Sequence, residues 1–394
     1  MAQVLAGIRV LDFGRYIAGP FCGALLADMG ADVIRIDRVG GSEDRFVMPV
    51  TEQGDGAVFL QSNRNKRSLT LEIASEEGRA IVRRLVAEAD VVIANMPAPT
   101  LANLGLDYET LKAIKPDIVL VAPSAFGDSA LLRDKIGFDG VGQVMSGGVY
   151  LSGYPDQPIK SMLPVVDYCT GIACALGAVA ALYERERSGQ GQQVGASLLQ
   201  TALNFSSGYL IEERVLGLQR QATGNRSQSY GPSDIFRTRG GWIIVQVIGP
   251  AMFRRWAKIV GQPELLDDSR FADDELRGQH GEVLSGLMSE WCAERSRDQA
   301  LEELNQAKIP AGPVYSPAEV NSDPAIAESG AFVRLRHPGV ESEVPYVAAP
   351  VSLSRTPLAI RKHAPLSGEH TEEVLREFGF SPGQIEALRA KGTV

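Results

Sequence analysis

Residues 7–38 read GIRVLDFGRYIAGPFCGALLADMGADVIRIDR, and this stretch decides the fold class of the chain. Its first eight residues are a short apolar run that predicts a strand, residues 19–29 predict a helix with small residues on one face, and residues 31–38 predict a second strand. A strand, a helix and a strand in this order predict two parallel strands joined by a right-handed crossover.

The same alternation continues further along the chain. Helices fit residues 76–88 and 108–114, and strands fit residues 90–94 and 117–123. Alternating strands and helices predict an α/β fold, namely a Rossmann-like doubly wound large domain. Two long apolar helices are then expected at 168–187 and 197–218, joined by a turn at 188–191.

A second, smaller α+β domain is expected in the middle of the chain. Residues 219–232 are polar and rich in Gly, Ser and Asn, which is typical of a linker. A second Pro- and Ser-rich linker is expected at 322–368. The large domain then comprises 1–220 and 330–394, and the small domain comprises 225–325. The small domain is expected to hold strands at 242–248 and 311–315 and helices at 252–260, 281–294 and 297–307, and a last helix is expected at 382–391.

Composition narrows the class of protein. A chain of 394 residues favours two domains, and a net charge of −9 argues against a nucleic-acid partner. The four cysteines show neither CxxC spacing nor a nearby His, so we expect no metal site, no disulfide framework and a reduced, cytoplasmic location. The longest apolar run, 172–182, is too short to span a bilayer, so we expect a core helix and no membrane partner.

Asp167 stands just ahead of that apolar run and has two interpretations. As an N-cap it would mark the start of the helix. As a nucleophile it would be a carboxylate kept ionised by the free N–H groups and the dipole of the helix N-terminus. The neighbouring Cys169 is a third candidate, as a thiol nucleophile, although no His lies near it in sequence.

Three further patterns could bind a ligand. The Gly-containing turn 13–20 leads into a helix, and Asp37 ends the second strand, but the GxGxxG fingerprint of a dinucleotide-binding dehydrogenase is absent. Residues 137–139 (GFD) and 146–148 (SGG) are either plain turns or part of a site. A basic cluster is either a solvated loop or a phosphate-binding site, and it consists of Arg15, Arg38, Arg64, Lys66 and Arg67.

In this order, these patterns resemble the class III CoA-transferases, the family of formyl-CoA and carnitine-CoA transferases. The resemblance covers nearly the whole chain. It rests on residues 7–38 and on the stretches NRNKRSLTLEI, ADVVIANMPAPTLANLGLDYETLKAIKPDIV, GFDGVGQVMSGG, PVVDYCTGIACALGAVAALYERERSGQGQQV, IPAGPVYS and LSGEHT.

The resemblance implies an interlocked homodimer, a large domain built from both chain ends, and CoA bound between the large and small domains. No prosthetic group is implied; coenzyme A, acyl-CoA and a carboxylic acid are substrates. Asp167 matches the catalytic aspartate. The CoA-binding positions are expected at Arg15, Ile17, Ala18, Arg38, Leu71, Glu72, Ile73, Ala74, Asn95, Met96, Asn103, Gly137 and Phe138.

Three departures from the family pattern bear on specificity. The family usually has a phosphate-binding Arg where this chain has Asn103, so neighbouring cations substitute for it or CoA is held more weakly. The Gly-rich loop of formyl-CoA transferases is not evident, because residues 240–242 (GGW) are a different motif. The racemases of the family have a His where this chain has Phe138, and Phe cannot move a proton. A 2-methylacyl-CoA racemase and a non-catalytic CoA-ester-binding protein remain as alternatives.

The implied mechanism passes through an aspartyl-acyl anhydride and an aspartyl-CoA thioester. Gly147 and Gly148 are candidate donors for the developing oxyanion, because a glycine backbone allows close approach. A small dicarboxylate of the succinate, malate, itaconate or mesaconate type is the expected substrate. Its second carboxylate could pair with Arg214, Arg237 or Arg239, each of which could equally be a surface arginine.

Overall fold

The computed structural model describes residues 3–132 and 135–394, and these residues form two compact units. The first unit contains the segment up to Ser146 together with Ser161–Ser207 and Ala325–Val394, and the second contains Gly147–Lys160 and Gly208–Pro324. The second unit therefore has different bounds from the predicted small domain. Residues Gly147–Lys160 belong to the second unit, and Gly153 among them pairs with Gly224 in an isolated antiparallel bridge.

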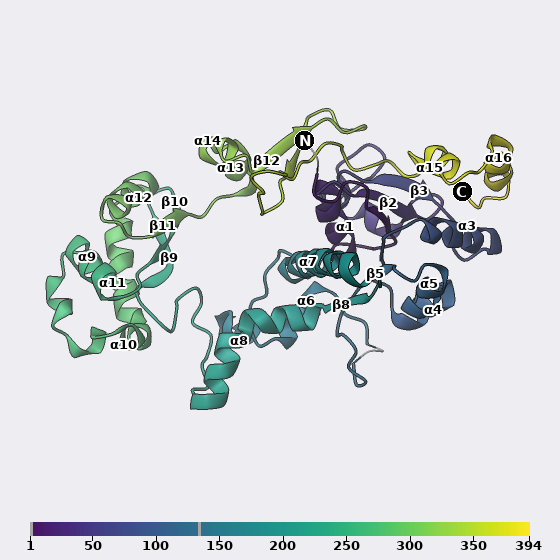
Figure 1. The fold of residues 1–394 in the computed structure, drawn as a ribbon. Coiled ribbons are helices and arrows are strands. Elements are labelled where there is room, and N and C mark those ends of the chain that lie inside the picture. The colour runs from purple at the N-terminus through teal and green to yellow at the C-terminus, as the bar shows by residue number, and fades with distance from the viewer. Residues whose placement is uncertain (1–2, 133–134) are drawn as a thin grey trace. The chain divides into compact units, whose positions relative to one another are not determined.

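The first unit is built on a six-stranded parallel sheet, which confirms the predicted α/β class (Figure 1). The strand order is β3-β2-β1-β4-β5-β8, and Val10 of β1 pairs with Val33 on one side and Val91 on the other. The sheet thus grows in opposite directions from β1, as doubly wound sheets do. The strands are β1 (Arg9–Asp12), β2 (Asp32–Asp37), β3 (Arg67–Thr70), β4 (Val91–Ile93), β5 (Val119–Ser124) and β8 (Gln193–Ser197).

Both faces of this sheet are covered, because alternate residues of each strand point to opposite sides. Leu11 and Val92 belong to the core beneath α3 (Glu76–Ala87), α4 (Ala98–Leu104), α5 (Tyr108–Ile114), α15 (Thr371–Glu377) and α16 (Pro382–Ala390). Val10 and Val91 belong to the opposite core, which α1 (Ala18–Asp28) and α7 (Val165–Ser188) cover.

Two predictions about this unit are wrong. The turn at 188–191 does not join two helices directly, because β8 lies between α7 and α8 (Leu198–Leu216). The predicted linker 322–368 is not structureless: it holds α14 (Pro324–Glu328) and the hairpin of β12 (Phe332–Leu335) and β13 (Val344–Val347). Tyr346 of that hairpin is buried against α2 (Ala57–Asn63), which gives the segment a small core of its own.

The second unit has an antiparallel sheet with the order β11-β10-β9. Trp256 and Phe253 lie in its core together with Ile243 and Val245 of the central strand. Its elements are β6 (Gly153–Tyr154), β7 (Gln157–Pro158), β9 (Ser233–Thr238), β10 (Gly241–Gln246), α9 (Pro250–Ile259), α10 (Asp274–Gln279), α11 (Gly281–Ala293), α12 (Arg297–Gln306), β11 (Ala311–Pro313) and α13 (Pro317–Ser322).

Helix α7 is longer than its apolar run suggested. Among the described residues it is the one helix that is long and apolar enough to cross a membrane by length and composition, and 44% of its most apolar window is buried. The argument that the run is too short is therefore wrong, since the helix has 24 residues. Cys174, Ala178 and Leu182 on its inner face pack into the core beneath α1, as expected of a core helix.

Candidate active site

The carboxyl edge of the parallel sheet gathers most of the predicted CoA-binding positions. Arg15 and Ile17 follow β1 and Ala18 begins α1, Arg38 follows β2, residues 71–74 follow β3, and Asn95 and Met96 follow β4 (Figure 1). The carboxyl ends of parallel strands lie at one edge, which is where open α/β sheets bind ligands.

The turn 13–20 and the segment 137–139 meet at this edge. Phe138 immediately precedes α6 (Asp139–Met145), and its ring lies edge-on to that of Tyr16, with 5.4 Å between ring centroids. The Phe138 side chain is 56% exposed, so it is open to a ligand. Asn103 lies on the last turn of α4 and is exposed.

Asn95 fixes the loop after β1. Its side-chain Oδ1 accepts a hydrogen bond from the backbone N–H of Arg15 at 2.7 Å, and its Nδ2 donates to the Arg15 carbonyl at 2.8 Å. The next residue, Tyr16, has φ of +63°, a left-handed conformation that costs a non-glycine residue energy. Its N–H donates to Asp44 at 3.1 Å. The loop is therefore held in a defined, strained conformation.

The interpretation of the basic cluster as a phosphate-binding site is wrong for three of its members. The side chain of Arg64 lies 2.7 Å from Asp28, that of Lys66 lies 2.6 Å from Asp12, and that of Arg67 lies 2.6 Å from Asp32. All three cations are buried, and a buried charge needs a partner. These three ion pairs link residues 64–67 to α1, β1 and β2.

The other two members differ from each other. Arg15 is buried, and its guanidinium donates to the carbonyls of Phe13 and Gly14, so it holds its own loop. The side chain of Arg38 is 66% exposed and lies 3.3 Å from the half-exposed Glu43. Of the cluster, Arg38 alone presents its charge to solvent.

Asp37 ends β2, where a dinucleotide-binding dehydrogenase places the acid that binds the ribose, but it does not have the environment of such an acid. Its buried carboxylate lies 2.9 Å from Arg35 and 2.7 Å from Arg45. Although burial opposes ionisation, these guanidinium groups hold the pKa of Asp37 well below its ordinary value. The carboxylate is committed to structure, which agrees with the missing dinucleotide fingerprint.

Asp167 is the third residue of α7 and does not cap it. The cap comes from Asp139, whose Oδ2 accepts hydrogen bonds from the N–H groups of Val166 at 2.9 Å and Asp167 at 3.3 Å. The N–H of Val165 donates to the Leu163 carbonyl. The N-cap interpretation of Asp167 is therefore wrong.

The Asp167 carboxylate makes no hydrogen bond or ion pair with the residues that the structure describes. Burial, and then the negative charge of Asp139, raise the pKa of Asp167 to about 7. The expectation that the helix N-terminus keeps this carboxylate ionised is thus wrong, because Asp139 already occupies its free N–H groups. The ionised form of Asp167 therefore has no partner among the described residues that would stabilise its charge.

Cys169 does not have the environment of an activated thiol. Burial and the charge of Asp139 raise the pKa of its thiol, so it stays protonated at neutral pH. Cys22, Cys174 and Cys292 are buried thiols. Within the described residues, no group of three or more His, Cys, Asp or Glu is arranged to hold a metal ion.

Asp139 is the residue that sequence reasoning missed. The GFD segment was noted, but Asp139 itself was given no role. Its signal was indirect: α7 begins after Pro164, which has no capping side chain, so the cap had to come from elsewhere.

The remaining predicted positions lie in the second unit or at its edge. Gly147 has φ of +85° and Gly148 precedes a short 3₁₀ helix at Val149–Leu151. The Arg237 guanidinium lies 5.9 Å from the Trp242 ring centroid, and Arg239 donates to the Ala293 carbonyl at 3.3 Å. Arg214 is exposed near the end of α8. The oxyanion and carboxylate roles of these residues stay predictions.

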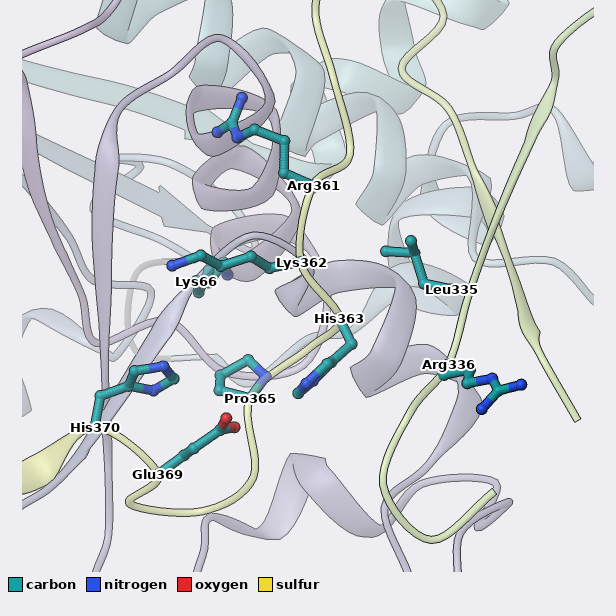
Figure 2. A pocket seen from close by; sticks show the side chains of 9 residues that line it. All are labelled: Lys66, Leu335, Arg336, Arg361, Lys362, His363, Pro365, Glu369 and His370. Carbon is teal, nitrogen blue, oxygen red and sulfur yellow. The ribbon is translucent and has the colours of Figure 1, made fainter. Parts of the chain in front are cut away.

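Figure 2 shows a pocket of about 290 Å³ in the first unit, formed by the C-terminal segment around Lys362, His363 and His370. Of the residues that the sequence singled out as candidates, it contains Lys66 of the basic cluster but neither Asp167 nor a predicted CoA-binding position. Much of its charge is already in use: Lys66 is paired with Asp12, and the Arg361 guanidinium donates to the Ala27 carbonyl.

Comparison with known proteins identifies the family. Residues 5–371 match CoA-transferase family III. The chain is 33% identical to the succinyl-CoA–D-citramalate CoA-transferase of Chloroflexus aurantiacus, over 99% of this chain and 98% of the other. It is 36% identical to the succinate–glutarate CoA-transferase of Agrobacterium fabrum, over 95% of each chain.

A solved structure is also similar. The crystal structure of a CAIB/BAIF family protein from Brucella suis matches with a TM-score of 0.84 and 32% identity, covering 96% of this chain and 100% of that one.

Proposed function

Because the chain belongs to CoA-transferase family III, we propose that it moves CoA from an acyl-CoA donor to a free carboxylic acid, with Asp167 as the nucleophile. The observation that carries the proposal is the Asp167 carboxylate at the start of α7, unpaired and half-buried, with its pKa raised to about 7. A carboxylate with free lone pairs suits attack on a thioester.

The reaction proceeds through two acyl exchanges at Asp167. A carboxylate oxygen attacks the donor thioester carbon, the C–S bond breaks, and an aspartyl-acyl anhydride and CoA thiolate form. The thiolate then attacks the aspartyl carbon, the anhydride C–O bond breaks, and an aspartyl-CoA thioester and the free donor acid result.

The acceptor reverses these steps. Its carboxylate attacks the aspartyl thioester and expels the CoA thiolate, which attacks the acceptor acyl carbon and restores the Asp167 carboxylate. Charge and protons balance over the cycle. Each addition develops an oxyanion, and the backbone N–H groups of Gly147 and Gly148 are our candidates to stabilise it.

Coenzyme A is proposed to bind along the carboxyl edge of the sheet. The backbone after β3 and the exposed ring of Phe138 border this edge, and Arg38 offers an exposed guanidinium for a phosphate. Asn103 offers no charge where the family usually has Arg, so Arg38 carries more of the phosphate binding.

Small dicarboxylates are the proposed acids. The relatives from Chloroflexus aurantiacus and Agrobacterium fabrum are named for succinyl-CoA or succinate together with D-citramalate or glutarate. We propose succinyl-CoA as donor and a small dicarboxylate as acceptor. The free thiols support a reducing, cytoplasmic setting.

An interlocked homodimer is proposed as the working form. Its support is the amount of apolar surface that α7 and α8 leave exposed, which is more than scattered surface residues account for. The exposed residues are Ile172, Leu176 and Tyr183 of α7 and Phe205, Tyr209, Leu210, Ile211 and Val215 of α8. Light scattering after size exclusion tests it; a monomer at micromolar concentration would refute it.

The test of function uses succinyl-CoA with D-citramalate, glutarate, L-malate, itaconate and mesaconate, each analysed by mass spectrometry for a new acyl-CoA. Asp167→Asn is expected to abolish the product. Cys169→Ala is the matched control, two residues along the same helix, and is expected to retain activity.

The intermediate gives a direct check. Hydroxylamine or borohydride trapping after addition of succinyl-CoA should modify Asp167, and peptide mass spectrometry locates the modified residue. Full activity of Asp167→Asn would mean that the chain works without this nucleophile. If Cys169→Ala lost its activity while Asp167→Asn kept it, the chain would be a thiol enzyme.

A further inference from the structure

We propose that Asp139 is a positioning residue of the transfer reaction: its carboxylate takes the free N–H groups at the start of α7 and so leaves the Asp167 carboxylate without a protein partner. This rests on the proposed role of Asp167 as nucleophile. Asp139 touches no reacting atom; it acts through Asp167.

The start of α7 accounts for this arrangement. A helix begins with four N–H groups that lack an acceptor within the helix, and an acidic residue in the first turn normally benefits from them. Here Val166 and Asp167 donate to Asp139, Val165 donates to the Leu163 carbonyl, and Tyr168 donates to the Pro164 carbonyl at 3.2 Å. None remains for the side chain of Asp167.

Asp139 is itself held from its other side. Its Oδ1 accepts a hydrogen bond from Nε2 of Gln143 at 2.5 Å, and Oε1 of Gln143 accepts one from the backbone N–H of Ser161 at 2.9 Å. A Cβ at Gly142 would lie 3.2 Å from Val166, which shows how closely α6 approaches α7. The capping carboxylate is therefore buried, fully used and fixed in place.

Asp139 is also the charge that acts on Asp167. The elements packed against α7 include α1, α6, β5 and β8, and α8, whose Leu198, Thr201 and Ala202 contact Val166 and Thr170. The ionisable residues of α8, namely Tyr209, Glu212, Glu213 and Arg214, lie in its C-terminal half, away from these contacts. Strands β5 (VLVAPS) and β8 (QVGAS) carry no ionisable side chain, and α1 carries the thiol of Cys22 and Asp28, which is paired with Arg64. Asp139 is the one ionisable residue of α6. On α7 itself Tyr168 and Cys169 follow Asp167, and the raised pKa of each keeps it neutral.

The consequence for the reaction follows from the charge balance. In its ionised, attacking form Asp167 is an anion beside a second anion, whereas acylated Asp167 is neutral. Acylation therefore relieves the repulsion between the two carboxylates, and Asp139 favours the covalent intermediates over the free enzyme. The unpaired lone pairs of Asp167 serve the same end, because no hydrogen bond has to break before attack.

The test replaces Asp139 by Asn, which keeps an acceptor oxygen for the α7 N–H groups but removes the charge. The Asp167 carboxyl is titrated by ¹³C NMR in the resting enzyme, its resonance assigned by its loss in Asp167→Asn. We expect its midpoint to fall by about one pH unit. The acid limb of kcat/KM for succinyl-CoA should move with it, while kcat falls and KM stays unchanged.

Two further variants keep the result interpretable. Asp139→Ser also supplies a neutral cap and replaces Asn if that variant misfolds by circular dichroism. Asp273→Asn is the matched control, because Asp273 caps α10 in the same way by accepting from the N–H of Leu276. An unchanged Asp167 midpoint in the Asp139 variants overturns the proposal, as does an equal shift in Asp273→Asn.

The titration needs no turnover, so it separates this proposal from the proposed function. An active Asp167→Asn enzyme refutes the nucleophile, whatever the midpoint does. An unchanged midpoint in Asp139→Asn, with an inactive Asp167→Asn, refutes the positioning role alone.

Discussion

The raised pKa of Asp167 predicts that this carboxylate lowers the stability of the folded protein, so that Asp167→Asn is more stable than the wild type above neutral pH. The folded protein holds this carboxyl at a pKa of about 7, against an ordinary value of 3.8, because it is buried beside Asp139. Between these two pH values the unfolded chain ionises while the folded protein does not. Folding stability therefore falls as pH rises through this window and stays low above pH 7.

The size of the effect follows from the shift. A shift of about three pH units corresponds to about 4 kcal/mol at most, at about 1.4 kcal/mol per unit. Asparagine keeps the shape of the side chain but leaves a half-buried amide without partners, which offsets part of the gain. We expect Asp167→Asn to exceed the wild type by about 2 kcal/mol at pH 8, after that offset.

The assay is urea unfolding at fixed protein concentration, followed by tryptophan fluorescence and circular dichroism, at pH 5, 6, 7 and 8. The difference in the free energy of unfolding between variant and wild type should grow from pH 5 to pH 7 and then level off. A constant difference across this range would show that the Asp167 carboxyl titrates normally, and the account of its environment would fail.

Three further predictions concern the residues around the sheet edge. Lys66→Met leaves Asp12 buried without its partner and should lower the free energy of unfolding by about 3 kcal/mol in urea, whereas the double variant with Asp12→Leu should recover much of it. Asn95→Ala frees the backbone of Arg15 and should raise KM for succinyl-CoA by about 10-fold, with a smaller change in kcat. Arg38→Ala should raise the same KM by about 10-fold at low salt and by less at 0.5 M NaCl; equal effects at both salt concentrations would refute a phosphate contact.

The sequence predicted well the elements whose burial leaves a local pattern. Strands β1 (RVLD) and β2 (DVIRID) carry buried Val, Leu and Ile because both faces of the sheet are covered, and α5 matches the predicted 108–114 residue for residue. The edge strands β3 (RSLT) and β8 (QVGAS) escaped prediction. Each is short and has a single large apolar residue, so pairing with a neighbour, and not its own composition, makes it a strand.

Charge partners could not be predicted because they lie far apart in sequence. Arg67 pairs with Asp32 and also with Glu373 and Glu377, and these acids lie 35 to 310 residues from it. A cluster of cations therefore looks alike in sequence whether it binds phosphates or holds a sheet together. The cap on α7 could not be predicted for the same reason, because Asp139 precedes Val166 by 27 positions.

The contact between α1 and α7 explains how one fold can position both the proposed nucleophile and the proposed CoA-binding loop. A Cβ at Gly171 would lie 2.9 Å from the carbonyl oxygen of Ala18, so only glycine lets α7 approach the first residue of α1 this closely. Asp167 lies one turn before Gly171, and Ala18 follows directly on the loop that Asn95 holds. A nucleophile on a 24-residue helix moves little relative to that loop, because the helix is anchored in the core along its inner face. Such anchoring lets the protein keep a half-buried carboxylate unpaired, since a mobile side chain would turn to solvent or to the helix N-terminus and lose its reactivity.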